Sequence, residues 1–104
     1  MRILKDLIEH AEETLEEIED YTIEAHHLRV EHKALADSYI KIAETHVEIY
    51  KILHERMVAL IMEEKQKGAH VPPEMQAIWD YEHEKMVRRF GDVKVKIEEY
   101  KKTY

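Results

Sequence analysis

Histidine and carboxylate side chains are the residues of this sequence best suited to chemistry, because both bind transition metals and transfer protons. The chain of 104 residues contains eight histidines and 23 acidic residues. Residues three positions apart share one face of a helix, so an acid followed by a histidine at i+3 presents an oxygen and a nitrogen ligand together. Glu24-x-x-His27 fits this spacing, and Asp80-x-x-His83 fits it with the shorter acid. In so acidic a chain, one such spacing does not by itself predict a di-iron site.

A second arrangement of these residues depends on how helical segments fold back on one another. If the chain turns at residues 68–72, His54 faces Met86, and His83 lies one turn away beside Glu82, so that the two histidines converge near one level. If it also turns near residue 33, the acids at residues 12–16 come close to His54. Mixed histidine and carboxylate ligands suit Zn²⁺ or Fe²⁺. The candidate metal ligands are His46, His54, His83, Glu13, Glu16 and Glu82.

The alternative role for these histidines is structural, with each imidazole donating a hydrogen bond to a carboxylate across a helix interface. His46 and His54 each stand in a helical row of otherwise apolar residues. We favour this alternative, so no cofactor is expected, and any metal that binds is expected to be iron or zinc. For His54 we expect a partly buried position and a carboxylate partner, whose charge raises its pKa while burial lowers it.

Composition excludes several classes of function. The sequence has no cysteine and no phosphate-binding loop, nucleophile elbow or catalytic triad, so we expect a non-enzymatic protein. The formal net charge of −7 would repel nucleic acid. No apolar run approaches the roughly 20 residues of a membrane span, and no signal-peptide core is present, so we expect a cytoplasmic protein without a membrane partner.

The elements that position these residues are predicted to be three helices. Residues 3–67 contain no glycine or proline, and apolar residues recur at steps of three and four. This stretch is either one long helix or two helices, and we favour a break at residues 32–36. Gly68, Pro72 and Pro73 end it and begin a third helix. The expected fold is one all-α domain spanning residues 1–104. It is an antiparallel three-helix bundle with helices near 2–32, 35–67 and 73–103, completed by oligomerisation.

The second predicted helix carries two apolar rows, which indicates contact with two partners. One row includes Leu35, Ile42 and Ile49, and the other includes Ile40 and Val47. This excess of apolar surface predicts self-association. The residues expected to form the interaction surface are Ile40, Val47, Ile61, Trp79 and Phe90.

The stretch from residue 35 to residue 86 contains "LADSY", "ILHE", "PPEM" and "IWDYEHEK". With these motifs it resembles small helical proteins of prophages and gut Firmicutes, which are distantly similar to rubrerythrin and ferritin-like bundles. The resemblance implies a turn at residues 31–34, and His54 and His83 match histidines that recur in the group. It transfers the fold more firmly than the function.

The sequence therefore predicts a non-enzymatic helical structural or interaction protein that forms homo-oligomers, and the resemblance suggests a phage origin. The alternative prediction is a metal-binding protein of the ferritin-like, di-iron kind with histidine and carboxylate ligands. Self-association is the partner interaction expected from the residues themselves.

Overall fold

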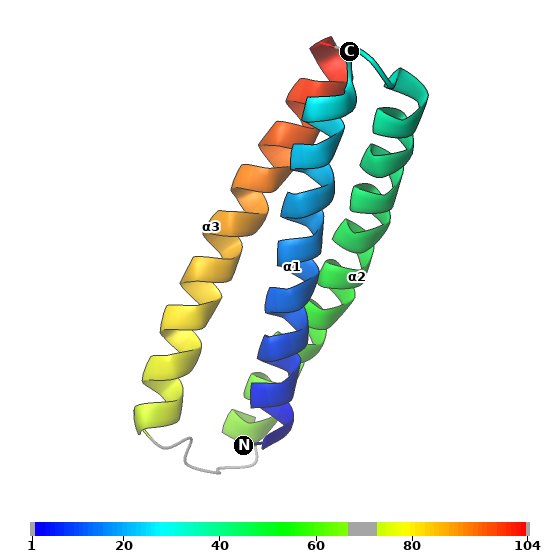
Figure 1. Cartoon of the computed structure of the whole chain (residues 1–104). Coiled ribbons are helices and arrows are strands. Elements are labelled where there is room, and N and C mark those ends of the chain that lie inside the picture. The colour runs from blue at the N-terminus through cyan, green and yellow to red at the C-terminus, as the bar shows by residue number, and fades with distance from the viewer. Residues whose placement is uncertain (1, 67–72, 104) are drawn as a thin grey trace.

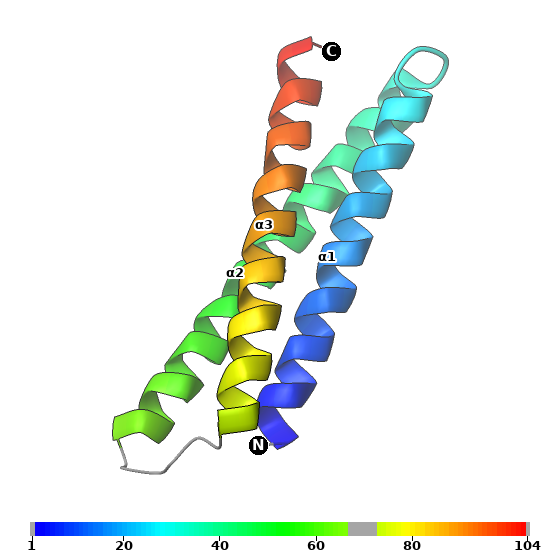
Figure 2. The same cartoon turned by 90° about the vertical axis from the view of Figure 1, so that its left-hand side faces the viewer.

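The computed structural model describes residues 2–66 and 73–103, apart from the side chain of residue 75. These residues form α1 (Arg2–Leu28), α2 (Lys33–Gln66) and α3 (Pro73–Thr103). α2 runs antiparallel to α1, and α3 returns in the direction of α1, giving a rod of 56 × 19 × 18 Å (Figure 1). Figure 2 shows from a second side that α1 and α3 rise from the same end of the rod. The described residues contain no strand, and the predicted all-α three-helix bundle is confirmed.

The chain breaks between α1 and α2 at residues 29–32, so the prediction of two helices in place of one is confirmed. The break needs no glycine or proline because local hydrogen bonds close it. The backbone N–H of His32 donates to the carbonyl oxygen of Leu28 at 2.8 Å. The guanidinium of Arg29 donates to the carbonyl oxygen of His26. These bonds satisfy carbonyl groups that the end of a helix leaves without partners.

The helix bounds agree with the predicted ones to within a few residues. α1 ends four residues before the predicted residue 32, and α3 has the predicted bounds of 73 and 103. The predicted end of the second helix at residue 67 and the turn at residues 68–72 lie outside the described residues. No described helix has the length and apolar character that crossing a membrane requires.

Small side chains line the contact between α1 and α2. Ala11 and Ala25 on α1 and Ala36 and Ala43 on α2 are completely buried. Because alanine side chains are small, they allow two helix axes to approach to the lower part of the usual range of interaxial distances. α3 covers the resulting hairpin with one buried stripe. Its members are Trp79, Met86, Val93, Ile97 and Tyr100.

The two apolar rows of α2 have different environments. Ile40, Val47 and Ile61 are buried in the core of the chain itself. The row containing Leu35 and Ile49 instead faces outward, with 45% and 42% of these side chains exposed.

The residues expected to form an interaction surface are therefore placed differently from the prediction. Ile40, Val47, Ile61 and Trp79 are buried, and Phe90 is partly buried against the same core. The reason is α3, which covers this face of the hairpin and leaves the other apolar row of α2 outermost.

Candidate functional site

His54 of α2 and His83 of α3 face each other across the bundle. Their Nε2 atoms lie 3.0 Å apart, a hydrogen-bond distance between two ring nitrogens. The ring centres are 5.1 Å apart and the ring planes differ by 18°. The rings therefore meet nearly edge to edge, with the two Nε2 atoms at the facing edges. A neutral imidazole has one N–H and one lone pair, so one ring donates its Nε2–H and the other accepts at Nε2. The sequence-based prediction that these histidines lie at one level is correct.

Aromatic rings extend this histidine pair in both directions. Trp79 lies against His83 with ring centres 4.9 Å apart, and Tyr50 lies against His54 at 5.9 Å. Phe90 packs on Tyr50 at 4.5 Å. The five rings, three from α3 and two from α2, form a continuous aromatic contact between the two helices. Packing of this kind holds both imidazoles in fixed orientations.

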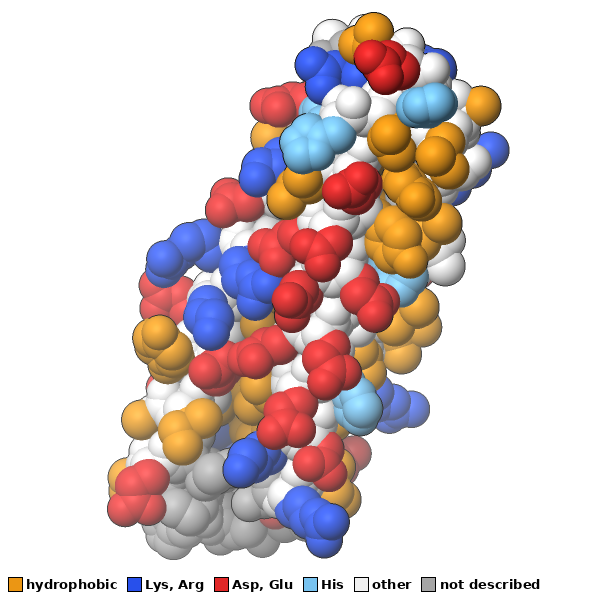
Figure 3. All heavy atoms as spheres, viewed as in Figure 1, with side chains coloured by type: hydrophobic (Ala, Val, Ile, Leu, Met, Phe, Trp, Pro, Cys, Tyr) orange, Lys and Arg blue, Asp and Glu red, His pale blue; other side chains and the backbone are white. Residues whose placement is uncertain are grey.

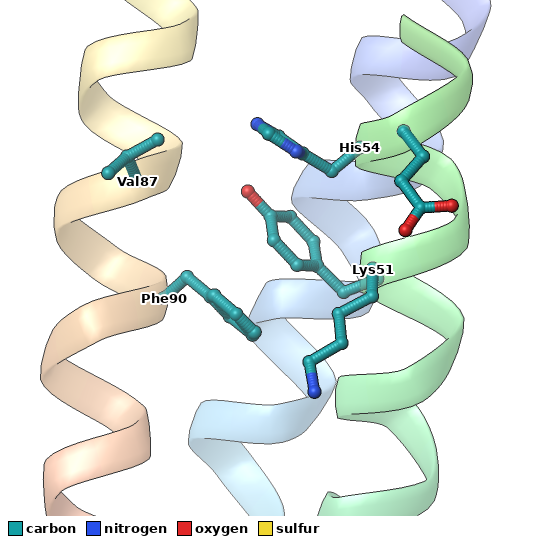
Figure 4. A pocket seen from close by; sticks show the side chains of 6 residues that line it. Lys51, His54, Val87 and Phe90 are labelled. Carbon is teal, nitrogen blue, oxygen red and sulfur yellow. The ribbon is translucent and has the colours of Figure 1, made fainter. Parts of the chain in front are cut away.

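A cavity of about 210 Å³ opens beside His54, lined by Tyr50, Lys51, Glu55, Val87 and Phe90. Figure 4 shows the His54 ring projecting from α2 towards α3, with Val87 and Phe90 on the opposite wall. The Tyr50 hydroxyl is buried and has no hydrogen-bond partner among the described residues. Burial raises the pKa of Tyr50 to about 12. An unpaired buried hydroxyl beside a cavity is suited to hydrogen-bonding a water molecule or a ligand.

The partner of His54 differs from the predicted one. A carboxylate was expected, but the ring bonds to His83. Burial lowers the pKa of His54, repulsion from His83 lowers it further, and the carboxylate of Glu55 opposes both effects. Of the two opposing effects expected on the pKa of His54, the lowering by burial is therefore the larger. Of the α1 acids expected near this ring, Glu12 instead interacts with Glu82, and Glu13 lies near His10.

Glu82, one residue before His83, points to a different partner. It faces Glu12 of α1, and hydrogen bonding to Glu82, burial and the repulsion between the two carboxylates raise the pKa of Glu12. The buried Oε2 atom of Glu82 has no hydrogen-bond partner among the described residues, and Lys85 Nζ lies 3.8 Å away from it. The two acids form a carboxyl pair between α1 and α3, separate from the histidine pair.

His46 has the structural role predicted for the histidines. Its Nε2 lies 2.6 Å from Glu17 Oε2, and its Nδ1 lies 2.9 Å from the carbonyl oxygen of Ile42. A singly protonated ring donates to one of these oxygens and a doubly protonated ring donates to both. Tyr21 packs on the same ring with centres 5.6 Å apart. His46 thus joins α1 to α2.

The remaining candidate ligands lie apart from the histidine pair. Glu13 is exposed and lies 3.9 Å from His10, and Glu16 contributes to the negative field around Arg89. No group of three or more His, Asp or Glu side chains that could hold a metal ion occurs within residues 2–66 and 73–103. The six candidates therefore belong to several local clusters.

Two contacts between helices were missed by reasoning from the sequence. Arg89 binds Glu19 through two nitrogens, and the hydroxyl of Tyr100 donates to Asp37 at 2.9 Å. Each pair is separated by more than 60 positions in the chain. In the sequence, these two contacts are indicated only by a long polar side chain at the edge of an apolar stripe.

The fold and this site place the chain in the class of all-α three-helix bundles with an aromatic and histidine contact between two helices. The chain matches no protein-family model, no curated protein and no solved structure. The functional argument therefore depends on the geometry of the chain itself.

Proposed function

We propose that this protein is a non-enzymatic helical structural protein that self-associates through the outer stripe of α2. The outer stripe consists of Leu35, Ile42, Ile49 and Ile52. The observation that carries the proposal is the exposure of this stripe, since Ile52 is 61% exposed and Leu35 and Ile49 are each more than 40% exposed. The chain uses its other apolar row for its own core.

The outer stripe forms one continuous face. Leu35, Ile42 and Ile49 are seven residues apart, so they repeat at nearly the same angle around the helix. Asp37 and His54, which contact α3, lie on the opposite side of α2. In Figure 3, an apolar band runs beside α1 on the side where α2 lies. A stripe of this kind on a long helix is typical of a helix-to-helix interface.

Charge favours a second copy of the chain as the occupant. α1 is strongly acidic, with Arg2 and Lys5 as its only lysine or arginine residues, so contacts between two α1 helices are repulsive. Contact through α2 avoids this repulsion. Lys41 and Glu48 are exposed and seven residues apart along one edge of the stripe. In an antiparallel pair of α2 helices, Lys41 of each copy meets Glu48 of the other across a two-fold axis.

The test is the molar mass in solution, measured by size-exclusion chromatography with light scattering at micromolar concentrations. The wild type is expected to have twice the chain mass of 12.5 kDa. The double variant Ile49→Glu/Ile52→Glu is expected to be a folded monomer, because two buried charges at an interface are strongly unfavourable. Val95→Glu is the matched control, since Val95 is similarly exposed, at 57%, but lies on α3.

Two results would overturn the proposal. One is a wild-type monomer at every concentration. The other is dissociation by Val95→Glu to the same extent as by the stripe variant. Circular dichroism of each variant verifies that its helices remain, so that loss of assembly is separated from unfolding.

The metal-binding alternative is less well supported as the main function, because the described histidines and carboxylates do not converge in a group of three. The phage origin suggested by the sequence resemblance stays a prediction.

A further inference from the structure

The histidine pair has a geometry that a simple packing role does not require. The two side chains come from different helices, and their Nε2 atoms point towards each other at a distance of 3.0 Å. We propose that His54 and His83 form a two-histidine binding site for a divalent transition-metal ion of the Zn²⁺ type, which links α2 to α3. This site is distinct from a ferritin-like di-iron centre, because no carboxylate takes part in it.

The distance between the nitrogens is close to what such an ion needs. Zn–N bonds of about 2.0–2.1 Å at a tetrahedral angle place two nitrogens about 3.3 Å apart. The observed separation is 3.0 Å, so a small rotation of the two rings makes room for the ion. In the absence of metal, the hydrogen bond between the rings holds them together. When the ion binds, the Nε2 proton of the donor ring moves to Nδ1 of the same neutral ring, so that both Nε2 lone pairs face the ion.

The ring neighbours support this arrangement. Trp79 and Tyr50 pack on the two imidazoles from opposite ends and restrict their orientations. Such restriction lowers the entropy cost of assembling the ligands.

The cavity beside His54 provides for the other coordination positions. Two histidines leave a tetrahedral ion with two open positions, which water fills. The cavity of about 210 Å³ is large enough for water molecules. Tyr50, one of its lining residues, is 98% buried and has a hydroxyl without a partner among the described side chains. A metal-bound water is a strong hydrogen-bond donor and would satisfy that hydroxyl.

The donor set also indicates which ions bind. Imidazole nitrogen suits Zn²⁺, Cu²⁺, Ni²⁺ and Co²⁺, whereas Mg²⁺ and Ca²⁺ require oxygen ligands. The site is therefore expected to discriminate against Mg²⁺, although the chain as a whole is acidic. Self-association through the outer stripe does not involve these residues, so the two proposals stand or fall separately.

The experiment uses the untagged full chain after treatment with a chelator. Zn²⁺ is titrated at pH 7.5 against a competing chromophoric chelator, and the melting temperature is measured with and without Zn²⁺. One ion per chain and a higher melting temperature are expected, with no change on adding Mg²⁺. His54→Gln and His83→Gln are each expected to lose the binding and the temperature shift. His27→Gln, an exposed histidine of α1, is the matched control and should bind Zn²⁺ as the wild type does.

A second measurement needs no variant and keeps the test valid if a variant fails to fold. Substoichiometric Cu²⁺ should first broaden the imidazole proton resonances of His54 and His83 in the NMR spectrum of the wild type. The proposal is overturned if Zn²⁺ does not bind, if His54→Gln binds it unchanged, or if the resonances of other histidines broaden first.

Discussion

Arg89 and Glu19 join α3 to α1 through two parallel hydrogen bonds. Nη2 of the arginine lies 2.6 Å from Oε1 of the glutamate, and its Nε lies 3.3 Å from Oε2. Both side chains are about 70% buried, with relative exposures of 28% and 33%. A guanidinium that binds both oxygens of a carboxylate fixes orientation as well as distance. This pair therefore sets how α3 sits on the hairpin of α1 and α2.

A double-mutant cycle of Arg89→Ala and Glu19→Ala should give a coupling energy of about 1 kcal/mol, measured by urea unfolding. The matched control is the pair Arg88 and Glu84, which are 70% and 76% exposed at a distance of 3.0 Å. Its coupling is expected to be below about 0.5 kcal/mol, because water screens exposed pairs. Equal couplings for the two pairs would show that the Arg89 contact has no special role.

Glu82→Gln should stabilise the protein at pH 7 by on the order of 0.5 kcal/mol, a value reduced for solvent screening. Folding raises the pKa of Glu12 above its ordinary value of 4.5. Protonated Glu12 therefore stabilises the folded state, and this contribution is fully present at pH values below 4.5. This effect is lost as the pH rises through the folded pKa, because both carboxylates are then charged. The amide removes the repulsion and can donate to Glu12.

The gain from Glu82→Gln should therefore be largest at pH 7 and disappear near pH 4, as measured by urea unfolding at both values. Glu84→Gln is the control, since Glu84 is exposed and bonds to Arg88 on its own helix. A gain from Glu82→Gln that does not change with pH would contradict the assignment of a carboxyl pair.

Ala43→Leu should destabilise the protein by about 1–3 kcal/mol. Ala43 is completely buried where α1 and α2 approach closely, so the larger side chain forces the helices apart. Ala77→Leu is the control, because Ala77 is exposed on α3 and leucine is nearly as good a helix former as alanine. Thermal unfolding of both variants tests the prediction, and a neutral Ala43→Leu would mean that the contact is looser than described.

Gly91→Ala should stabilise the protein by about 0.5–1 kcal/mol, because glycine loses more backbone conformational entropy than alanine when a helix forms. The position is exposed within α3, and a Cβ atom added there has no neighbour within 4 Å. The free energy of unfolding in urea measures the gain. A loss of stability would show that the α3 backbone departs from regular helix at this residue.

The helices themselves could be predicted from the sequence because their determinants are local. The absence of glycine and proline, together with apolar steps of three and four, led to helix bounds close to those of α2 and α3. The break between α1 and α2 was also predicted, although its position was a few residues too late. Counting residues from the expected turns was enough to bring His54 and His83 to one level, since helix rise per residue is constant.

The sequence did not determine which apolar row of α2 faces inward, and the tertiary structure decided it. Ile49 and Val47 are equally apolar, yet Val47 is 7% exposed and Ile49 is 42% exposed. The choice depends on where α3 lies around the hairpin, which no local pattern encodes. The same holds for the site: His83 bonds to His54, while Glu82, the residue before it, faces Glu12. Adjacent residues on a helix point about 100° apart, so the rotation of each helix about its axis selects the partners, and close packing of all three helices sets that rotation.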